Sequence, residues 1–117
     1  MKLFKIVIFT SVYPSTPSTP TATNLQSISV KVNWSSPNLG DSTLTSYKMQ
    51  YKKTSDSSWV DKDAGSSTGS TTLTGLKPFT DYKIRMKLNT DLQSNLYSPI
   101  LSVKTTSDSK YPKAFIV

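Results

Sequence analysis

The sequence predicts an all-β fold in which about seven short antiparallel strands form a two-layered sandwich. Three observations support this prediction. Apolar and polar residues alternate with a period of two in several segments, turn-forming residues separate these segments, and no segment shows the period of an amphipathic helix. The connections are also too short to hold a crossover helix, so neighbouring strands are expected to run antiparallel.

Residues 1–13 have a basic start followed by a short apolar stretch. This pattern is typical of a secretory signal peptide, but Lys5 interrupts the stretch and no small-x-small cleavage site follows. Three interpretations stay open: a signal peptide, an extraneous leader, and a strand left over from a preceding module. The stretch is too short to span a bilayer, and no later run of about 20 apolar residues follows, so no membrane span is expected.

Residues 14–20 form a Pro/Ser/Thr-rich linker ahead of the domain, which we assign to residues 21–107. Prolines at a three-residue spacing impose extended geometry on this linker and remove backbone donors. Its hydroxyls are candidate acceptors of O-linked sugars in a secreted protein, although a plain spacer or a first edge strand is the simpler interpretation. Residues 108–117 form a C-terminal tail beyond the last strand.

Three longer segments each have one apolar and one polar face, and each predicts a half-buried strand. Their inward residues are Ile28, Val30, Val32 and Trp34 in the first, Tyr47, Met49 and Tyr51 in the second, and Tyr82, Ile84, Met86 and Leu88 in the third. Shorter strands are predicted around Trp59 and Val60, at 72–74, and at 101–105. Residues 61–70 between them are predicted to be a loop.

The composition removes most catalytic and metal-binding chemistry. The chain has no His, no Cys and no Glu, so its seven Asp are the only carboxylate side chains. Imidazole and thiolate ligands, disulfides, and His- or Cys-based catalysis are therefore excluded. Asp61 and Asp63 are the one close pair of carboxylates, and solvated loop charge explains them better than a calcium or catalytic site. We expect no enzyme activity, no metal and no cofactor.

The stretch TLTGLKPFTDYKIRMKL, residues 72–88, holds a corner of the form L-x-P-x-T-x-Y. In such a corner a tyrosine buries its ring at the start of a strand while its hydroxyl bonds upstream backbone, here near residues 76–78. With this corner and its aromatic residues, the chain resembles the fibronectin type III family over about residues 20–107. The resemblance implies a seven-stranded immunoglobulin-like β-sandwich. The residues that carry it are Trp34, Tyr47, Tyr51, Trp59, Leu76, Pro78, Thr80 and Tyr82.

Phe79 departs from the family pattern, in which Gly or a small polar residue commonly follows the proline. The simpler interpretation is a ring that lies over neighbouring loop atoms, and the alternative is an apolar contact for an adjacent module. The chain contains no Arg-Gly-Asp tripeptide and no W-S-x-W-S box. Integrin binding through that tripeptide is therefore not implied, and neither is membership of the membrane-proximal modules of cytokine receptors.

The family's topology would gather the chain's basic residues on one sheet face. The net charge is +7, and the outward residues of the strands that this topology places side by side are Lys48, Lys52, Lys83, Arg85, Lys87 and Lys104. With no acid between them, these cations would form a patch for heparin-like acidic glycans or an acidic protein. The alternative is a solvated face that keeps the sheet soluble. No nucleic acid is expected, because no recognition element is present and the tyrosines are placed inward.

Two further features are candidates for contact or modification. The loops at 36–46, 61–70 and 89–98 are predicted to face partners, with Leu92, Leu96 and Tyr97 as apolar anchors. Asn33 begins the single Asn-x-Ser sequon and would be a glycosylation site in a secreted protein. Its mid-strand position and the neighbouring Trp34 favour a plain surface residue instead.

These observations predict a non-catalytic extracellular module that acts in protein interaction and as a spacer, within a cell-surface receptor or adhesion protein. Its partner would be a protein or the adjacent modules. An accessory spacer module of a secreted multidomain carbohydrate-active enzyme is the alternative, and the Pro/Thr-rich lead suits it equally well. An intracellular array module of the muscle-scaffold kind is a third hypothesis, in which a signal-like leader would serve no purpose.

Overall fold

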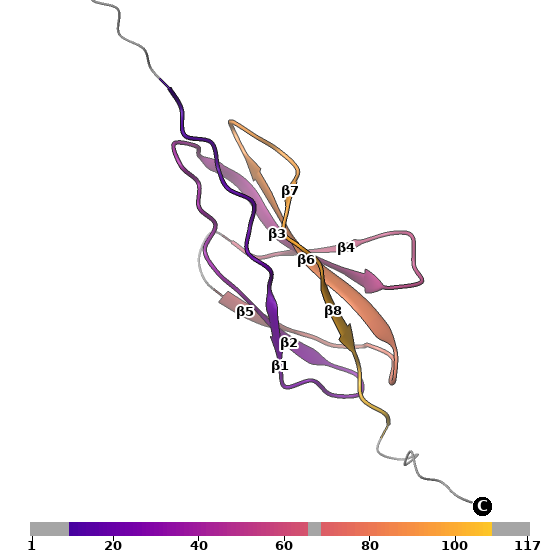
Figure 1. Cartoon of the computed structure of the whole chain (residues 1–117). Helices are drawn as coiled ribbons and strands as arrows, with labels where there is room; N and C mark the ends of the chain where they lie inside the picture. Colours follow the sequence, from indigo (N-terminus) through magenta and orange to yellow (C-terminus); the bar gives the residue numbers. More distant parts are fainter. Residues whose placement is uncertain (1–9, 66–68, 109–117) are drawn as a thin grey trace, which may run out of the picture.

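The computed structural model describes residues 10–65 and 69–108, and these form eight β-strands and no helix. The strands are β1 Thr21–Thr23, β2 Val30–Trp34, β3 Leu44–Lys53, β4 Val60–Asp63, β5 Gly69–Leu73, β6 Asp81–Thr90, β7 Leu96–Tyr97 and β8 Leu101–Lys104. They pair into a three-stranded sheet, β1-β2-β5, and a five-stranded sheet, β4-β3-β6-β7, in which β8 also pairs with β6 (Figure 1). Every pairing is antiparallel, so the predicted all-β sandwich is confirmed. No helix within the described part of the chain is long and apolar enough to cross a membrane.

The core lies between the two sheets, because alternate residues of each strand turn inward. The three-stranded sheet contributes Val30, Val32, Trp34 and Leu73, and the five-stranded sheet contributes Tyr47, Met49, Tyr82, Ile84, Met86 and Leu88. All of them are buried, and each large apolar side chain contributes about 1.5–3 kcal/mol when it is fully removed from water. Tyr51 is half-buried against this cluster.

Ile28 does not belong to the core, and its predicted inward placement is wrong. Its side chain is 53% exposed. Strand β2 begins only at Val30, and the carbonyl of Ile28 instead accepts a hydrogen bond from the N–H of Leu76 at 3.0 Å. Because Ile28 lies in the turn that precedes β2, its burial does not follow the alternation of the strand.

The predicted tyrosine corner is present where the chain enters β6. The N–H of Lys77 donates to the hydroxyl oxygen of Tyr82 at 2.9 Å, which confirms the predicted bond to upstream backbone. Within the turn, the hydroxyl of Thr80 donates to the carbonyl of Pro78 at 2.8 Å. The N–H of Thr80 donates to the hydroxyl of Thr105 at 2.9 Å. The corner therefore ties the crossing between the sheets to the end of β8.

The backbone explains why Phe79 is unusual at its position. Its φ is +48°, a left-handed conformation that glycine adopts freely and a bulky residue adopts at a cost. Its side chain is 54% exposed, and the ammonium of Lys104 lies 4.1 Å from the ring centroid. The ring thus lies against Lys104, a side chain of β8, whereas the simpler interpretation placed it over neighbouring loop atoms.

Gly69 allows β5 to approach the buried tryptophan closely. It lies directly opposite Trp34 in the β2–β5 register. A Cβ atom at this position would be 2.9 Å from the Cζ2 atom of Trp34, which is closer than van der Waals contact permits. The packing of β5 against Trp34 therefore requires glycine at position 69.

The segment that precedes β1 lies along the sandwich (Figure 1). Its three prolines are buried, and the N–H of Ser15 donates to the carbonyl of Asn38 at 3.0 Å. The N–H of Val12 donates to a carboxylate oxygen of Asp41 at 2.7 Å, and the N–H of Asp41 donates back to the carbonyl of Val12 at 2.8 Å. Val12 of the leader and Ser15 of the linker thus both contact the loop between β2 and β3, while the domain boundaries stay a prediction.

Candidate interaction face

The β3–β6 pair sets the positions of the basic side chains. Its register places Lys48 opposite Lys87 and Lys52 opposite Lys83. Directly opposed residues of an antiparallel pair point to the same side of the sheet, and the residues that alternate with these lysines, Met49, Tyr51, Ile84 and Met86, face the core. The lysines therefore lie on the outer side of the five-stranded sheet, which we call the cationic face. Its basic and aromatic members, with Gln50, are Lys48, Lys52, Trp59, Lys83, Arg85, Lys87, Tyr97 and Lys104.

Arg85 occupies the middle of the cationic face. Its guanidinium carbon lies 4.1 Å from the centroid of the Trp59 ring and 4.0 Å from that of Tyr97. The two rings come from the two sides of β6, Trp59 from the segment between β3 and β4 and Tyr97 from β7. The Nε–H of Arg85 also donates to the side-chain oxygen of Gln50 at 2.8 Å. Stacking and hydrogen bonding together hold this side chain in one orientation.

Two lysines extend this arrangement at its ends. The ammonium of Lys52 lies 5.1 Å from the Trp59 ring centroid and donates to the carbonyl of Asp56 at 2.8 Å. The ammonium of Lys87 lies 5.9 Å from the Tyr97 ring centroid. Cations and rings therefore alternate across the face, and we call this series the cation–aromatic row. Its order is Lys52, Trp59, Arg85, Tyr97, Lys87.

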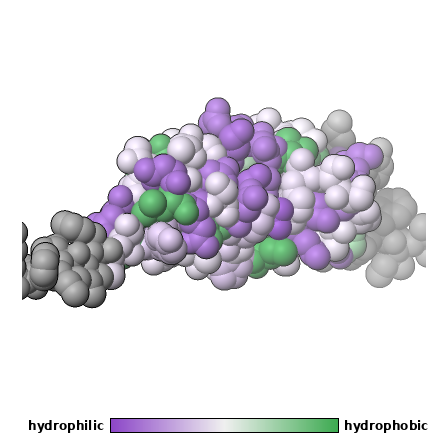
Figure 2. Space-filling view, turned by 90° about the horizontal axis from the view of Figure 1, so that it is seen from above, coloured by the Kyte–Doolittle hydropathy of each residue, from purple (hydrophilic) through white to green (hydrophobic). Residues whose placement is uncertain are grey.

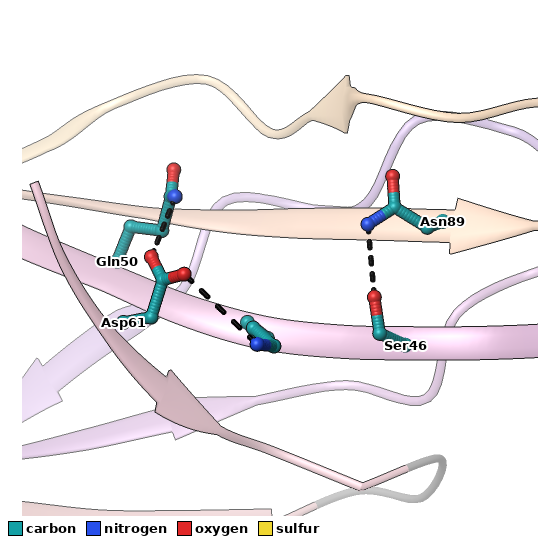
Figure 3. A network of polar contacts seen from close by, with 5 residues as sticks. Ser46, Gln50, Asp61 and Asn89 are labelled. Carbon is teal, nitrogen blue, oxygen red and sulfur yellow. Dashed lines mark hydrogen bonds and ion pairs between the residues drawn. The ribbon is translucent and has the colours of Figure 1, made fainter.

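Acidic residues also lie on this face, so the predicted absence of acids between the cations is wrong. Asp61 and Asp63 were expected in a loop, but they belong to β4, where they lie opposite Gln50 and Lys48. The side-chain amide of Gln50 donates to Asp61 at 2.8 Å, and a second carboxylate oxygen of Asp61 lies 4.0 Å from the ammonium of Lys48 (Figure 3). This is the only ion pair between described side chains.

The far ends of the cationic face differ in character. Beyond Lys87 the face becomes neutral, since the side-chain amide of Asn89 donates to the hydroxyl of Ser46 at 2.8 Å (Figure 3). At the other end Lys104 lies opposite Asp81 in the β6–β8 register. The positive charge is therefore concentrated around the cation–aromatic row.

The three predicted apolar anchors have different surroundings. Leu92 is 38% exposed in the turn after β6, whereas Leu96 is half-buried against the core. Tyr97 is 37% exposed and belongs to the cation–aromatic row, so the expectation that the tyrosines point inward is wrong for this residue. Because Leu96 is inward, strand alternation places Tyr97 outward, and that signal was present in the sequence.

Asn33 lies on the other sheet. It is half-buried in β2, and its side-chain amide donates to the hydroxyl of Thr23 on β1 at 3.1 Å. A sugar on Asn33 would replace this bond and would project from the three-stranded sheet, away from the cationic face. Glycosylation of Asn33 stays a prediction.

Polar residues dominate the visible surface, and the exposed apolar side chains form separate patches (Figure 2). Isolated exposed apolar residues are normal on a folded domain and need no partner. The cation–aromatic row differs from them because it combines charge, rings and a fixed geometry.

Comparison with known families identifies the fold. The family model described as fibronectin type III domain matches residues 15–104. The chain belongs to the fibronectin type III family. Domains of this family are generally non-catalytic modules used in protein interaction and as spacers. The signature residues Trp34, Leu76 and Tyr82 are buried in the core of this domain.

Solved structures agree with the assignment. The sixth fibronectin type III domain of human fibronectin type III domain containing protein 3 shares 22% identity, with a TM-score of 0.72, and the match covers 91% of this chain and 97% of that one. Domains A168–A170 of titin share 20% identity with a TM-score of 0.60, covering 80% of this chain and 34% of that one. The twitchin kinase region from C. elegans shares 22% identity with a TM-score of 0.65, covering 88% and 18%. Comparison with curated proteins finds no match.

Proposed function

We propose that this fibronectin type III domain is an extracellular protein-interaction module of a cell-surface receptor or adhesion protein, and that the cationic face is its contact surface. The cation–aromatic row is the observation that carries the proposal. Arg, Trp and Tyr are the residue types enriched at interface hot spots, and here they occur together on an accessible sheet face. None of these three side chains, Arg85, Trp59 and Tyr97, belongs to the hydrophobic core.

The electrostatics of the face support a binding role. Lys48 faces Lys87 and Lys52 faces Lys83, and like charges directly opposite each other in a sheet are destabilising. One ion pair, at 4.0 Å, offsets part of this repulsion at Lys48 only. An acidic partner would relieve this repulsion. The arrangement therefore favours binding of such a partner at a cost to the stability of the free domain.

The extracellular setting rests on the sequence. The basic start and apolar stretch of residues 1–13 have the order of a signal peptide. The likeness to titin and twitchin domains is a likeness of fold and does not bear on compartment. Production of the full chain in animal cells tests this part of the proposal. Recovery of the chain from the medium is expected, and retention of the intact chain inside the cells would contradict an extracellular role.

Binding of the labelled full chain to the surface of cultured animal cells tests the contact surface. Replacing Lys83, Arg85 and Lys87 by Ala removes three charges from the cationic face. A control with Ala at Lys31, Lys62 and Lys77 removes the same charge elsewhere, since Lys31 lies on β2 and Lys62 lies opposite the inward Met49. We expect the first variant to bind at least about tenfold more weakly and the control to bind like the unchanged chain. Equal binding by both variants would refute the assignment of the face.

A further inference from the structure

We propose that the cationic face recognises an extended acidic peptide segment in which two acidic residues stand four positions apart and an apolar side chain stands midway between them. This inference rests on the proposed function and specifies the chemistry of its partner. The spacing of the charged and aromatic groups on β6 and its neighbours carries the argument.

The basic residues of β6 recur at every second position. Lys83, Arg85 and Lys87 share one side of the strand, because side chains of a strand alternate between its faces. A strand rises about 3.3 Å per residue, so Lys83 and Lys87 stand about 13 Å apart with Arg85 midway. An extended peptide has the same rise. Its residues at positions one, three and five can therefore lie opposite these three residues in register.

Each end of this set offers a pair of lysines. Lys83 lies directly opposite Lys52, and no carboxylate of a described residue lies within 4.0 Å of either ammonium. Lys87 lies directly opposite Lys48, whose ammonium is 4.0 Å from Asp61, an exposed pair that contributes little. A carboxylate of the partner placed between two ammonium groups would make charge-assisted hydrogen bonds at each end.

The middle of the set is not a third anion site. The guanidinium of Arg85 contacts two rings, and its Nε–H is already donated to Gln50. Tyr97 is 37% exposed and Trp59 is half-buried, so the rings offer an apolar surface between the two lysine pairs. An apolar side chain fits there. A sulfated glycan, which carries anionic groups along its whole length, would place some of them over the rings.

Isothermal titration of the full chain with short synthetic peptides tests this inference. The first peptide, Ser-Asp-Ser-Phe-Ser-Asp-Ser, has the proposed spacing, and the second has the same composition with the two Asp adjacent. A third replaces Phe by Ser, and a heparin-derived oligosaccharide is titrated in parallel. We expect the first peptide to bind at least about tenfold more tightly than either other peptide, and less tightly at high salt.

Variants of the chain locate the binding. Replacing Lys83 and Lys87 by Ala should abolish binding of the first peptide, while replacing Lys31 and Lys77 by Ala should leave it unchanged. Equal binding of the two isomeric peptides would overturn the proposed spacing. Binding of the oligosaccharide alone would overturn the peptide partner but would keep the cationic face as a contact surface. If the cell-binding test also shows no effect of the face variant, the proposed function fails as well.

Discussion

The guanidinium of Arg85 contacts the rings of both Trp59 and Tyr97, with centroid distances of 4.1 and 4.0 Å. Three separate segments supply this contact: β6, β7 and the residues ahead of β4. It exists only because the β3–β4, β3–β6 and β6–β7 registers bring them to the same side of the sheet. The geometry of the candidate site therefore depends on the pairing of these strands.

A double-mutant cycle measures how strongly these groups interact. We expect Arg85→Ala and Trp59→Ala each to lower the free energy of unfolding, since each removes a cation–π contact and covered apolar surface. The double variant should lose about 0.5–1 kcal/mol less than the sum of the single losses. Urea unfolding of the four proteins checks this. Strictly additive losses would show that the two side chains do not interact.

Charge reversal at one lysine should stabilise the domain. Lys83 lies opposite Lys52, so Lys83→Glu replaces a repulsive cross-strand pair by an attractive one. We expect a gain of about 0.2–1 kcal/mol in the free energy of unfolding. Lys31→Glu is the matched control, because its cross-strand neighbours are Thr23 and Thr72. A loss of stability specific to Lys83→Glu, measured by urea unfolding, would contradict the repulsion inferred for the cationic face.

Removal of one hydroxyl tests the corner. Tyr82→Phe leaves the N–H of Lys77 without its 2.9 Å acceptor and keeps the buried ring. The expected loss is about 0.5–1.5 kcal/mol in the free energy of unfolding, the net contribution of one partly buried hydrogen bond. Tyr97→Phe, at an exposed tyrosine, is the control and should change stability little. If the two losses were equal, the hydroxyl of Tyr82 would have no special role.

The stability of the domain should depend on Tyr47 differently at neutral and alkaline pH. Burial raises the pKa of Tyr47 above its ordinary value of 10.0, and its hydroxyl donates to the carbonyl of Ser35 at 3.0 Å. Because the pKa of Tyr47 is raised in the folded state, the contribution of its hydroxyl to stability is fully present below pH 10. This contribution is lost as the pH rises through the folded-state pKa. Tyr47→Phe lacks this group.

Thermal or urea unfolding of the two proteins between pH 7 and 11 checks the sign. The stability advantage of Tyr47 over Phe, about 1 kcal/mol at pH 7, should be largest near neutral pH and should shrink above pH 10. Lysines titrate in the same range in both proteins, so only the difference is informative. A difference that stayed constant up to pH 11 would contradict the burial of the phenol.

The sequence predicts the core well because burial in a strand follows a period of two. Val30, Val32 and Trp34 obey this period, and so do the inward residues of β6. The corner at Tyr82 is equally predictable, since its chemistry is local. Ile28 is mispredicted because it lies in a turn, where alternation no longer describes burial.

The site was less predictable, because it depends on contacts between distant strands. The sequence predicts a short strand around Trp59 and Val60, but the rest of β4 reads Asp-Lys-Asp and is exposed, so no apolar pattern extends the predicted strand to Asp63. Its pairing with β3 nevertheless brings Asp61 beside Lys48. Alternation places Lys83, Arg85 and Lys87 on one face, but the contact with Trp59 and Tyr97 needs three registers at once.

The side-chain NMR signal of Arg85 tests the cation–aromatic row most directly. Arg85 is the only arginine in the chain, so one Nε–H resonance reports on it without ambiguity. Ring currents from Trp59 and Tyr97 should shift its Nε–H and δ-methylene protons upfield, and Trp59→Ala and Tyr97→Ala should each reverse part of the shift. Resonances at the positions of a solvated arginine, unchanged in both variants, would contradict the arrangement on which the proposed contact surface depends.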